Sequence, residues 1–241
     1  MKKNKTIFIS ASSSGIGYHL ASGYKDLGYN IIINGKKLSK LKKASAELGE
    51  CDYFLGDISE DKNIKSLIKK IKKNYKNLDV LLCNLGSSNY KKNNLNLEYA
   101  FKYNFFSTTK LIKNSEKILK KNNSKIICIS SICGVESIEG APLGYSIAKS
   151  ALNFYINLAS REFAKDGITI NGIVPGNILF DGSIWSKKMK NNSKKTKKYI
   201  KNNVPINKFG TPQNILSICK MITEDDNKFI TGTLIKVDGG Q

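Results

Sequence analysis

The sequence has little of several residue types that build well-known sites. It holds one histidine, His19, one tryptophan, Trp185, and, among 40 basic residues, one arginine, Arg161. With a single histidine and no cluster of cysteine and histidine, we expect no metal site. Arginine is the usual fork for phosphates and base edges, so its scarcity argues against a specific nucleic-acid function.

Long apolar runs are also missing. No segment reaches the roughly 18 uninterrupted apolar residues of a membrane span. The basic start is followed only by Ile7–Ile9 before small polar residues take over, which is too short for a signal peptide. The five cysteines form no CxxC pair, and three of them lie in or beside apolar runs, as core residues of a reducing compartment do. We therefore expect a cytoplasmic protein.

Positive charge, in contrast, is abundant. The formal net charge is +21 at pH 7, a value that raises the question of nucleic-acid binding. The lysines are spread over most of the expected helices instead of forming one stripe. A basic nucleic-acid binder stays open as an alternative, which a steep salt dependence of DNA retention without cofactor binding would support.

Short apolar runs alternate with segments of helical period along the chain. The runs are continuous, as in parallel strands covered on both faces, and apolar residues recur at helical spacing over 64–75 and 151–163. The pattern predicts an α/β fold: one Rossmann-type domain over residues 1–241, with a doubly wound, seven-stranded parallel sheet between two layers of helices. The expected strands are Thr6–Ser10, Tyr29–Asn34, Tyr53–Leu55, Val80–Asn84, Lys125–Ser130, Thr169–Val174 and Thr233–Val237.

One segment, about 178–205, interrupts this alternation. It has few apolar residues, and we interpret it as a solvated helix or a mobile flap over a substrate. Its lysines are Lys187, Lys188, Lys190, Lys194, Lys195, Lys197, Lys198 and Lys201.

The first expected strand leads into a turn of small residues, and a helix follows. Small side chains let the backbone approach a pyrophosphate, and the start of a helix offers free N–H groups and a positive dipole end. We therefore expect a dinucleotide to bind at this turn. The candidate residues are Ser10, Ser12, Ser13, Ser14, Gly15, Ile16 and Gly17.

The end of the second expected strand indicates which dinucleotide binds. An Asp or Glu at this place would hold the ribose 2′-hydroxyl of NAD. The chain has Asn34-Gly35-Lys36-Lys37 instead, and ammonium groups suit a 2′-phosphate. We predict NADP(H), with Lys36 as the first phosphate contact and Lys37 as the second. NAD(H) is the less favoured alternative, in which case both are ordinary surface lysines.

A tyrosine and a lysine open the helical segment at 145. Their spacing puts Tyr145 and Lys149 on one face of a helix. A free phenol has a pKa of about 10, and a nearby ammonium favours the phenolate. A hydroxyl tuned in this way can give a proton to a forming alkoxide or take one from an alcohol.

Together and in this order, the motifs resemble those of the short-chain dehydrogenase/reductase family over nearly the whole chain. Tyr145-Ser146-Ile147-Ala148-Lys149 resembles the YxxxK motif of that family. The turn resembles TGxxxGIG, with Ala11 where the first glycine is expected. The family has the predicted fold, and the resemblance implies hydride transfer between a nicotinamide and a carbonyl or alcohol carbon.

The resemblance also implies two further catalytic residues. Ser131 follows a strand end and matches a serine that polarises the substrate carbonyl. It lies fourteen residues before Tyr145, one more than is common in the family, so we expect a longer loop, with Ser130 as the fallback. Asn104 lies mid-helix, an unfavoured place for asparagine, and matches a residue that holds a water beside Lys149.

Further cofactor contacts are implied by the same resemblance. Tyr145 and Lys149 would bind the cofactor as well as act in catalysis. The remaining candidates are Asp57, Ile58, Asn84, Gly86, Pro175, Gly176 and Ile178.

The resemblance is strongest to 3-oxoacyl-carrier-protein reductases. We expect a keto or hydroxy substrate that is either carrier-bound or small, and an anionic substrate is among the candidates. We also expect a homodimer or homotetramer built on the helices that hold Asn104 and Tyr145, with the apolar 152–163 face at the contact. Two alternatives stay open. One is a reductase or dehydrogenase of a nucleotide-linked sugar in surface-glycan synthesis, and the other is a cofactor-binding sensor or scaffold without chemistry.

Overall fold

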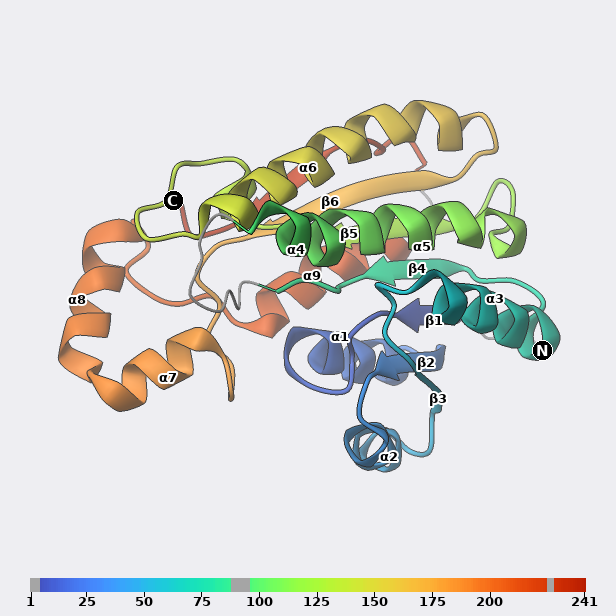
Figure 1. The fold of residues 1–241 in the computed structure, drawn as a ribbon, viewed down its shortest axis with the longest axis horizontal. Helices are drawn as coiled ribbons and strands as arrows, with labels where there is room; N and C mark the ends of the chain where they lie inside the picture. Colours follow the sequence, from blue (N-terminus) through green and yellow to red (C-terminus); the bar gives the residue numbers. More distant parts are fainter. Residues whose placement is uncertain (1–4, 88–95, 225–227) are drawn as a thin grey trace.

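A parallel sheet forms the centre of the computed structural model, which describes residues 5–87, 96–224 and 228–241. Within these residues the sheet has seven strands in the order β3-β2-β1-β4-β5-β6-β7 (Figure 1). Every expected strand is present, and no end differs by more than one residue, so the predicted fold class is confirmed. The strands are β1 (Thr6–Ile9), β2 (Asn30–Gly35), β3 (Asp52–Leu55), β4 (Val80–Cys83), β5 (Lys125–Ile129), β6 (Thr169–Pro175) and β7 (Leu234–Val237).

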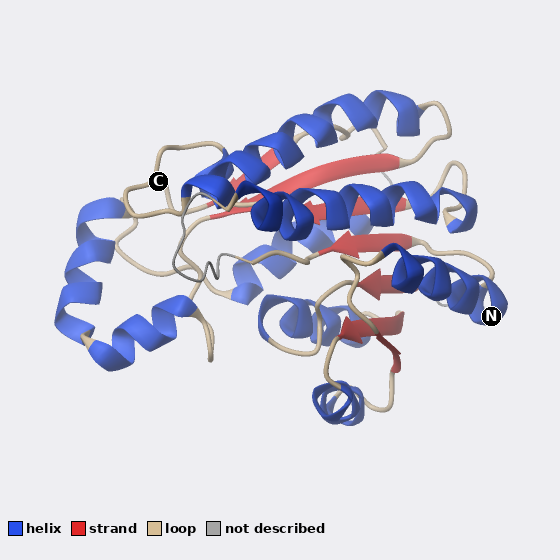
Figure 2. Cartoon of the chain, in the orientation of Figure 1, coloured by secondary structure: helices blue, strands red, loops and turns tan. Residues whose placement is uncertain are grey.

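Helices cover both faces of the sheet (Figure 2). One face carries α1 (Gly15–Asp26), α2 (Leu38–Glu47) and α9 (Pro212–Glu224). The other face carries α3 (Asp61–Tyr75), α4 (Leu97–Phe101), α5 (Ser107–Ser115) and α6 (Leu143–Ala164). None of the helices within the described residues is long and apolar enough to cross a membrane.

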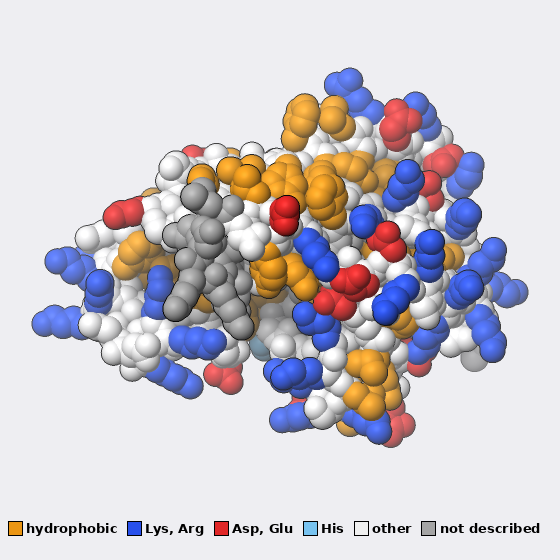
Figure 3. Space-filling model, viewed as in Figure 1, with side chains coloured by type: hydrophobic (Ala, Val, Ile, Leu, Met, Phe, Trp, Pro, Cys, Tyr) orange, Lys and Arg blue, Asp and Glu red, His pale blue; other side chains and the backbone are white. Residues whose placement is uncertain are grey.

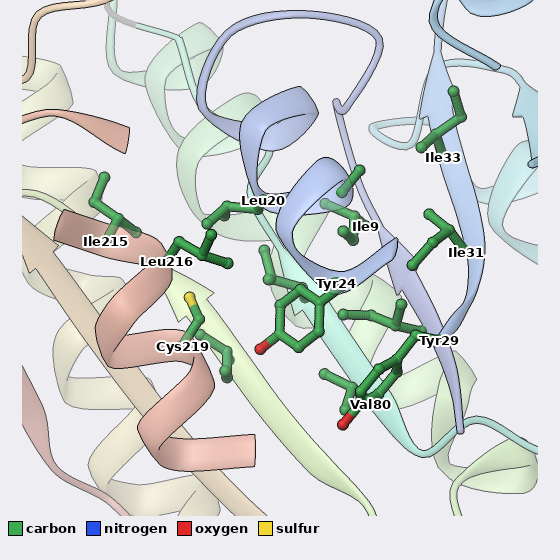
Figure 4. Packing of buried hydrophobic residues seen from close by; sticks show 14 of the residues in the cluster. Ile9, Leu20, Tyr24, Tyr29, Ile31, Ile33, Val80, Ile215, Leu216 and Cys219 are labelled. Atoms are coloured by element: carbon green, nitrogen blue, oxygen red, sulfur yellow. The ribbon is translucent and has the colours of Figure 1, made fainter. Parts of the chain in front are cut away.

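The strands are apolar on both sides because each side meets a layer of helices. In β1, Ile7 and Ile9 pack with α1 and α9, whereas Phe8 between them packs with α3 and α5. Figure 4 shows the first layer, in which Leu20 of α1 faces Leu216 of α9 across the core. Continuous apolar runs are therefore what this sheet requires.

The order of the strands reverses between β1 and β4. From β1 the chain builds outward through β2 and β3, and it then returns to place β4 on the other side of β1. The carboxyl ends of β1 and β4 thus flank the crevice where open α/β sheets bind their ligands.

The segment expected to be a flap folds as two helices, α7 (Ile184–Asn191) and α8 (Ser193–Asn203). They project beyond the carboxyl ends of the strands, at the left of Figure 1. Only Thr196 and Ile200 of these two helices are buried. The segment is therefore helical and largely exposed to solvent.

Candidate active site

The turn after β1 is held by its own serine side chains. The Ser10 Oγ accepts hydrogen bonds from the backbone N–H groups of Asn84 (2.9 Å) and Leu85 (3.0 Å). The Ser12 Oγ donates to the Ile9 carbonyl (2.6 Å) and accepts from the Asn34 N–H (2.9 Å). Both hydroxyls therefore brace the ends of β1, β2 and β4, and their role in the site is to shape the turn.

Two residues of the turn have left-handed backbone conformations. Gly15 has φ 61°, and Ala11, at the place of the expected glycine, has φ 50°. Gly17 is needed for a different reason: a Cβ there would lie 2.6 Å from the Ala11 carbonyl oxygen and 2.6 Å from the Asn84 Nδ2. The helix thus begins against the turn at a distance that only glycine permits.

Ala11→Gly is expected to stabilise the fold by about 1 kcal/mol, because a left-handed backbone costs about 1–2 kcal/mol for a residue with a Cβ. The measurement is the free energy of urea unfolding. As a matched control, Ala46→Gly in α2, where the backbone is helical, is expected to destabilise by about 1 kcal/mol. A loss of stability in the Ala11 variant would contradict the argument.

The start of α1 is open to an anion. Its N-cap, Ser14, makes no side-chain cap hydrogen bond, and the first turn contains no acidic residue. The free N–H groups and the positive end of the helix dipole are the features that bind a diphosphate. A Cβ at Gly15 would lie 3.0 Å from the Phe180 ring, so the glycine also leaves room for the chain that leads into α7.

The two charged residues expected at the adenosine end pair with each other. The Lys36 Nζ lies 3.3 Å from the Asp57 carboxylate and 5.4 Å from the centre of the Tyr103 ring. Partial burial pushes the pKa of Asp57 up, but hydrogen bonding by Ser59 and the charge of Lys36 outweigh it, and the pKa lies below its ordinary value. Lys37 is exposed at the start of α2.

Ile58 was expected to contact the cofactor, but its side chain lies in the core. Its side chain is 2% exposed and packs in the core beneath α3. Only its backbone is therefore open to a cofactor.

Tyr145 and Lys149 lie one turn apart on α6. The Lys149 Nζ is 5.9 Å from the centre of the Tyr145 ring and donates a hydrogen bond to the Ile129 carbonyl at the end of β5 (2.8 Å). The lysine is 2% exposed. Its burial lowers its pKa to about 8, although three neighbouring cysteine thiols oppose the shift.

The hydrogen bonds of the two serines after β5 distinguish them. The Ser130 Oγ donates to Asn153 Oδ1 on α6 (2.5 Å), so its proton is already used. The Ser131 Oγ accepts from the Cys133 N–H (3.2 Å). The Ser131 hydroxyl also hydrogen-bonds the Cys133 thiol, so these contacts stay within its own turn, whereas Ser130 is tied to another helix. The geometry thus favours Ser131 over its fallback.

Asn104 lies in a single turn of π-helix, Lys102–Phe106, between α4 and α5, and it is fully buried. Its Nδ2 donates to the carbonyls of Ala100 and Ser87 (both 3.0 Å), and its Oδ1 accepts from the Ser87 N–H (2.8 Å). A Cβ on Gly86 would lie 3.2 Å from this Oδ1 and 3.3 Å from the Lys149 Nζ. Asn104, Gly86 and Lys149 are therefore neighbours, and π-turns of this kind often occur at functional sites.

One cavity of about 410 Å³ brings three of the four expected catalytic residues together with part of the expected cofactor site. Ser131 and Tyr145 both line this cavity. Residues 138–142, in the loop that separates the two in the sequence, line it as well. The other expected site residues in its wall are Ile16, Asn84, Gly86, Lys149, Pro175, Gly176 and Ile178. The expected residues outside it are Ser10, Ser12, Ser13, Ser14, Gly15, Gly17, Lys36, Lys37, Asp57, Ile58 and Asn104.

A family model described as "Enoyl-(Acyl carrier protein) reductase" matches residues 10–241. This chain belongs to the short-chain dehydrogenase/reductase family. It is 29% identical over 246 residues to the 3-oxoacyl-[acyl-carrier-protein] reductase FabG of Rickettsia prowazekii, covering 98% of this chain and 96% of that protein. It is 27% identical to the FabG of Staphylococcus aureus, over 100% of this chain and 99% of that protein. As a member of this family it is an oxidoreductase.

Solved structures share the fold of this short-chain dehydrogenase/reductase. The L-sorbose reductase of Gluconobacter frateurii, complexed with NADPH and L-sorbose, has a TM-score of 0.87 and 22% identity over 99% of this chain and 96% of that one. The RhlG/NADP complex of Pseudomonas aeruginosa has a TM-score of 0.89 and 20% identity, over 99% and 96%.

Asn153 and two residues of the loop before α6 were not predicted from the sequence of this family member. Asn153 holds Ser130 and also donates to the Gly134 carbonyl (3.1 Å). It is an asparagine on the apolar face of α6, which is the same kind of signal that pointed to Asn104. The two loop residues in the cavity wall, Ile138 and Glu139, had no such signal. The segment expected to be a flap contributes further residues to this wall: Phe180, Ile184, Trp185, Lys188 and Tyr199.

Proposed function

We propose that this protein is an NADPH-dependent ketoreductase. The observation that carries the proposal is the meeting of Ser131, Tyr145 and Lys149 around one cavity at the switch point of the sheet. The cofactor fits on two counts: the first turn of α1 is open to a diphosphate, and the close approach of α1 to the turn before it needs glycine at Gly17. Two solved structures of the same fold, complexed with NADPH and with NADP, support the choice.

Each side chain has one task in this proposal. The bound nicotinamide supplies the hydride for the carbonyl carbon. The Ser131 hydroxyl turns from the Cys133 thiol to the substrate carbonyl oxygen and donates a hydrogen bond to it, which polarises the carbonyl. Tyr145 gives its phenolic proton to the same oxygen, and the buried Lys149 ammonium stabilises the phenolate that remains. Asn104 lies next to Gly86 and Lys149. In this proposal it holds the water through which a proton reaches Lys149.

The substrate we favour is a 3-oxoacyl thioester, because relatives that this chain matches over nearly their full length reduce 3-oxoacyl-[acyl-carrier-protein]. We propose that 178–205, with α7 and α8, is a substrate flap, and that residues 1–241 form a single domain. The experiment is reduction of a 3-oxoacyl thioester with NADPH, followed by nicotinamide absorbance. The absence of both turnover and NADPH binding would overturn the proposed function.

Lys36→Ala is expected to weaken NADPH binding by about 10-fold, because a charge-assisted contact to a phosphate contributes about 1.5–3 kcal/mol. NADH binding is expected to stay unchanged, since NADH has no 2′-phosphate. The measurement is titration of both cofactors by nicotinamide fluorescence. Lys40→Ala removes an exposed lysine of α2 and serves as the matched control. Equal losses for NADPH and NADH would contradict the assigned contact.

We also propose a homodimer built on α5 and α6. The expected 152–163 face divides in the structure: Leu152 is in the core, whereas Phe154 and Leu158 are 65% and 50% exposed. Figure 3 shows apolar side chains gathered over these helices. Phe154→Glu is expected to shift the mass measured by sedimentation from dimer to monomer, because the pairing would bury this charge. A monomeric unsubstituted protein would exclude the dimer.

A further inference from the structure

Helices α7 and α8 contribute one part of the cavity wall, its roof, which contains an ordered aromatic group. The Trp185 ring on α7 lies 5.1 Å from the Tyr199 ring of α8, tilted by 31°, and 5.4 Å from the Phe209 ring. Trp185 and Tyr199 both line the cavity. Contacts from two other segments thus fix the indole, which gives an apolar surface to the cavity that Ser131 and Tyr145 also line.

A cation is held on the same indole. The Lys188 Nζ lies 4.4 Å from the centre of the Trp185 ring, within the range of a cation–π interaction. Lys188 lines the cavity as well. In the part of the chain that the structure describes, Lys188 makes no ion pair. The ring therefore limits the freedom of the ammonium and leaves its charge for a ligand.

One acidic side chain lies in the same cavity wall as Lys188. Glu139, on the loop before α6, is the acidic side chain in the cavity wall, and it too makes no ion pair within the described residues. It lies near Tyr199, whose pKa is raised by burial first and by Cys133 and Glu139 next. Glu139 forms no ion pair with Lys188 within the described residues, so the Lys188 ammonium is available to an anion beside the aromatic surface.

We propose that Trp185 and Lys188 form a subsite for the far end of the substrate, which selects ketones that carry an apolar segment and then an anionic group. This inference rests on the proposed ketoreductase function and names its substrate class. The carbonyl lies at Ser131 and Tyr145, the apolar segment lies on the Trp185 ring, and the carboxylate or phosphate binds the Lys188 ammonium. A free keto acid and the phosphate of a carrier arm share this chemistry.

The test compares matched substrates on the full-length protein. A keto acid is compared with its amide of equal chain length, and a 3-oxoacyl thioester on phosphopantetheine is compared with the same acyl group on N-acetylcysteamine, which has no phosphate. We expect the anionic member of one pair to have kcat/KM about 10-fold higher, as one charge-assisted contact gives. Preference within the first pair identifies a free acid, and preference within the second identifies a carrier arm.

Two variants separate the subsite from a general effect of charge. Lys188→Met is expected to remove the preference by raising KM for the anionic substrate. Lys187→Met removes the adjacent lysine, which lies outside the cavity wall, and is expected to keep the preference.

The outcomes distinguish the two proposals. Equal kcat/KM for the charged and neutral members of both pairs, or equal effects of Lys188→Met and Lys187→Met, overturns the subsite and leaves the ketoreductase intact. Failure of all four substrates together with loss of NADPH binding overturns the proposed function itself.

Discussion

Tyr145→Phe is expected to lower the rate of ketone reduction by about a thousandfold, within the range of about 10²–10⁴ that a positioned general acid contributes. The variant keeps the ring that lies 5.9 Å from Lys149 and loses only the hydroxyl. NADPH affinity and the free energy of unfolding are expected to stay close to those of the unsubstituted protein. The measurement is single-turnover reduction at saturating NADPH.

The matched control for this prediction is Tyr155→Phe. Tyr155 is on the same helix, packs against Phe105, and lies outside the cavity wall. Tyr155→Phe also removes a phenolic oxygen, but at a position outside the cavity wall. The rate of ketone reduction is therefore expected to stay unchanged. If Tyr145→Phe retained the rate, Tyr145 would not be the proton donor. If it also lost NADPH binding, the defect would be in cofactor binding and the comparison would no longer isolate proton transfer.

Lys149→Met is expected to abolish measurable reduction and to change how stability depends on pH. Burial places the pKa of Lys149 at about 8 in the folded chain, below the 10.5 of an ordinary lysine. Below pH 8 both states carry the proton, and the buried ammonium costs the fold about 3 kcal/mol. Between pH 8 and 10.5 the unfolded chain binds more protons, so the free energy of unfolding rises with pH.

The methionine variant has no such proton. The difference in unfolding free energy, variant minus unsubstituted protein, is therefore expected to fall steadily as the pH is raised above 8. Urea unfolding at a series of pH values from neutral to alkaline measures it. Lys40→Met, which removes an exposed lysine, provides the comparison for general charge effects. A difference that is constant with pH would show that the buried lysine does not release its proton in this window.

The sequence determined the sheet with little error because burial on both faces requires the continuous apolar runs that are visible in the chain. It also determined the pairing of Tyr145 with Lys149, since helix geometry places residues four apart on one face. Both relations involve residues that are close together in the chain, so they can be inferred from one sequence. The family assignment followed from the order of such local motifs.

Choices that depend on distant partners needed the tertiary structure. Ser131 and its fallback Ser130 are adjacent in the sequence, and the hydrogen bond of Ser130 to Asn153, on a different element, distinguishes them. The pairing of Lys36 with Asp57 joins the ends of β2 and β3.

The roof of the cavity is the largest such case. Trp185 and Lys188 are ordinary residues of a lysine-rich segment until α7 and α8 fold across the carboxyl ends of the strands. The sequence by itself therefore determined the fold, which follows from periodicity, and the family, which follows from the order of the motifs. The tertiary structure alone decided which side chains line the cavity, because a side chain's partners across a cavity lie at no fixed distance along the chain.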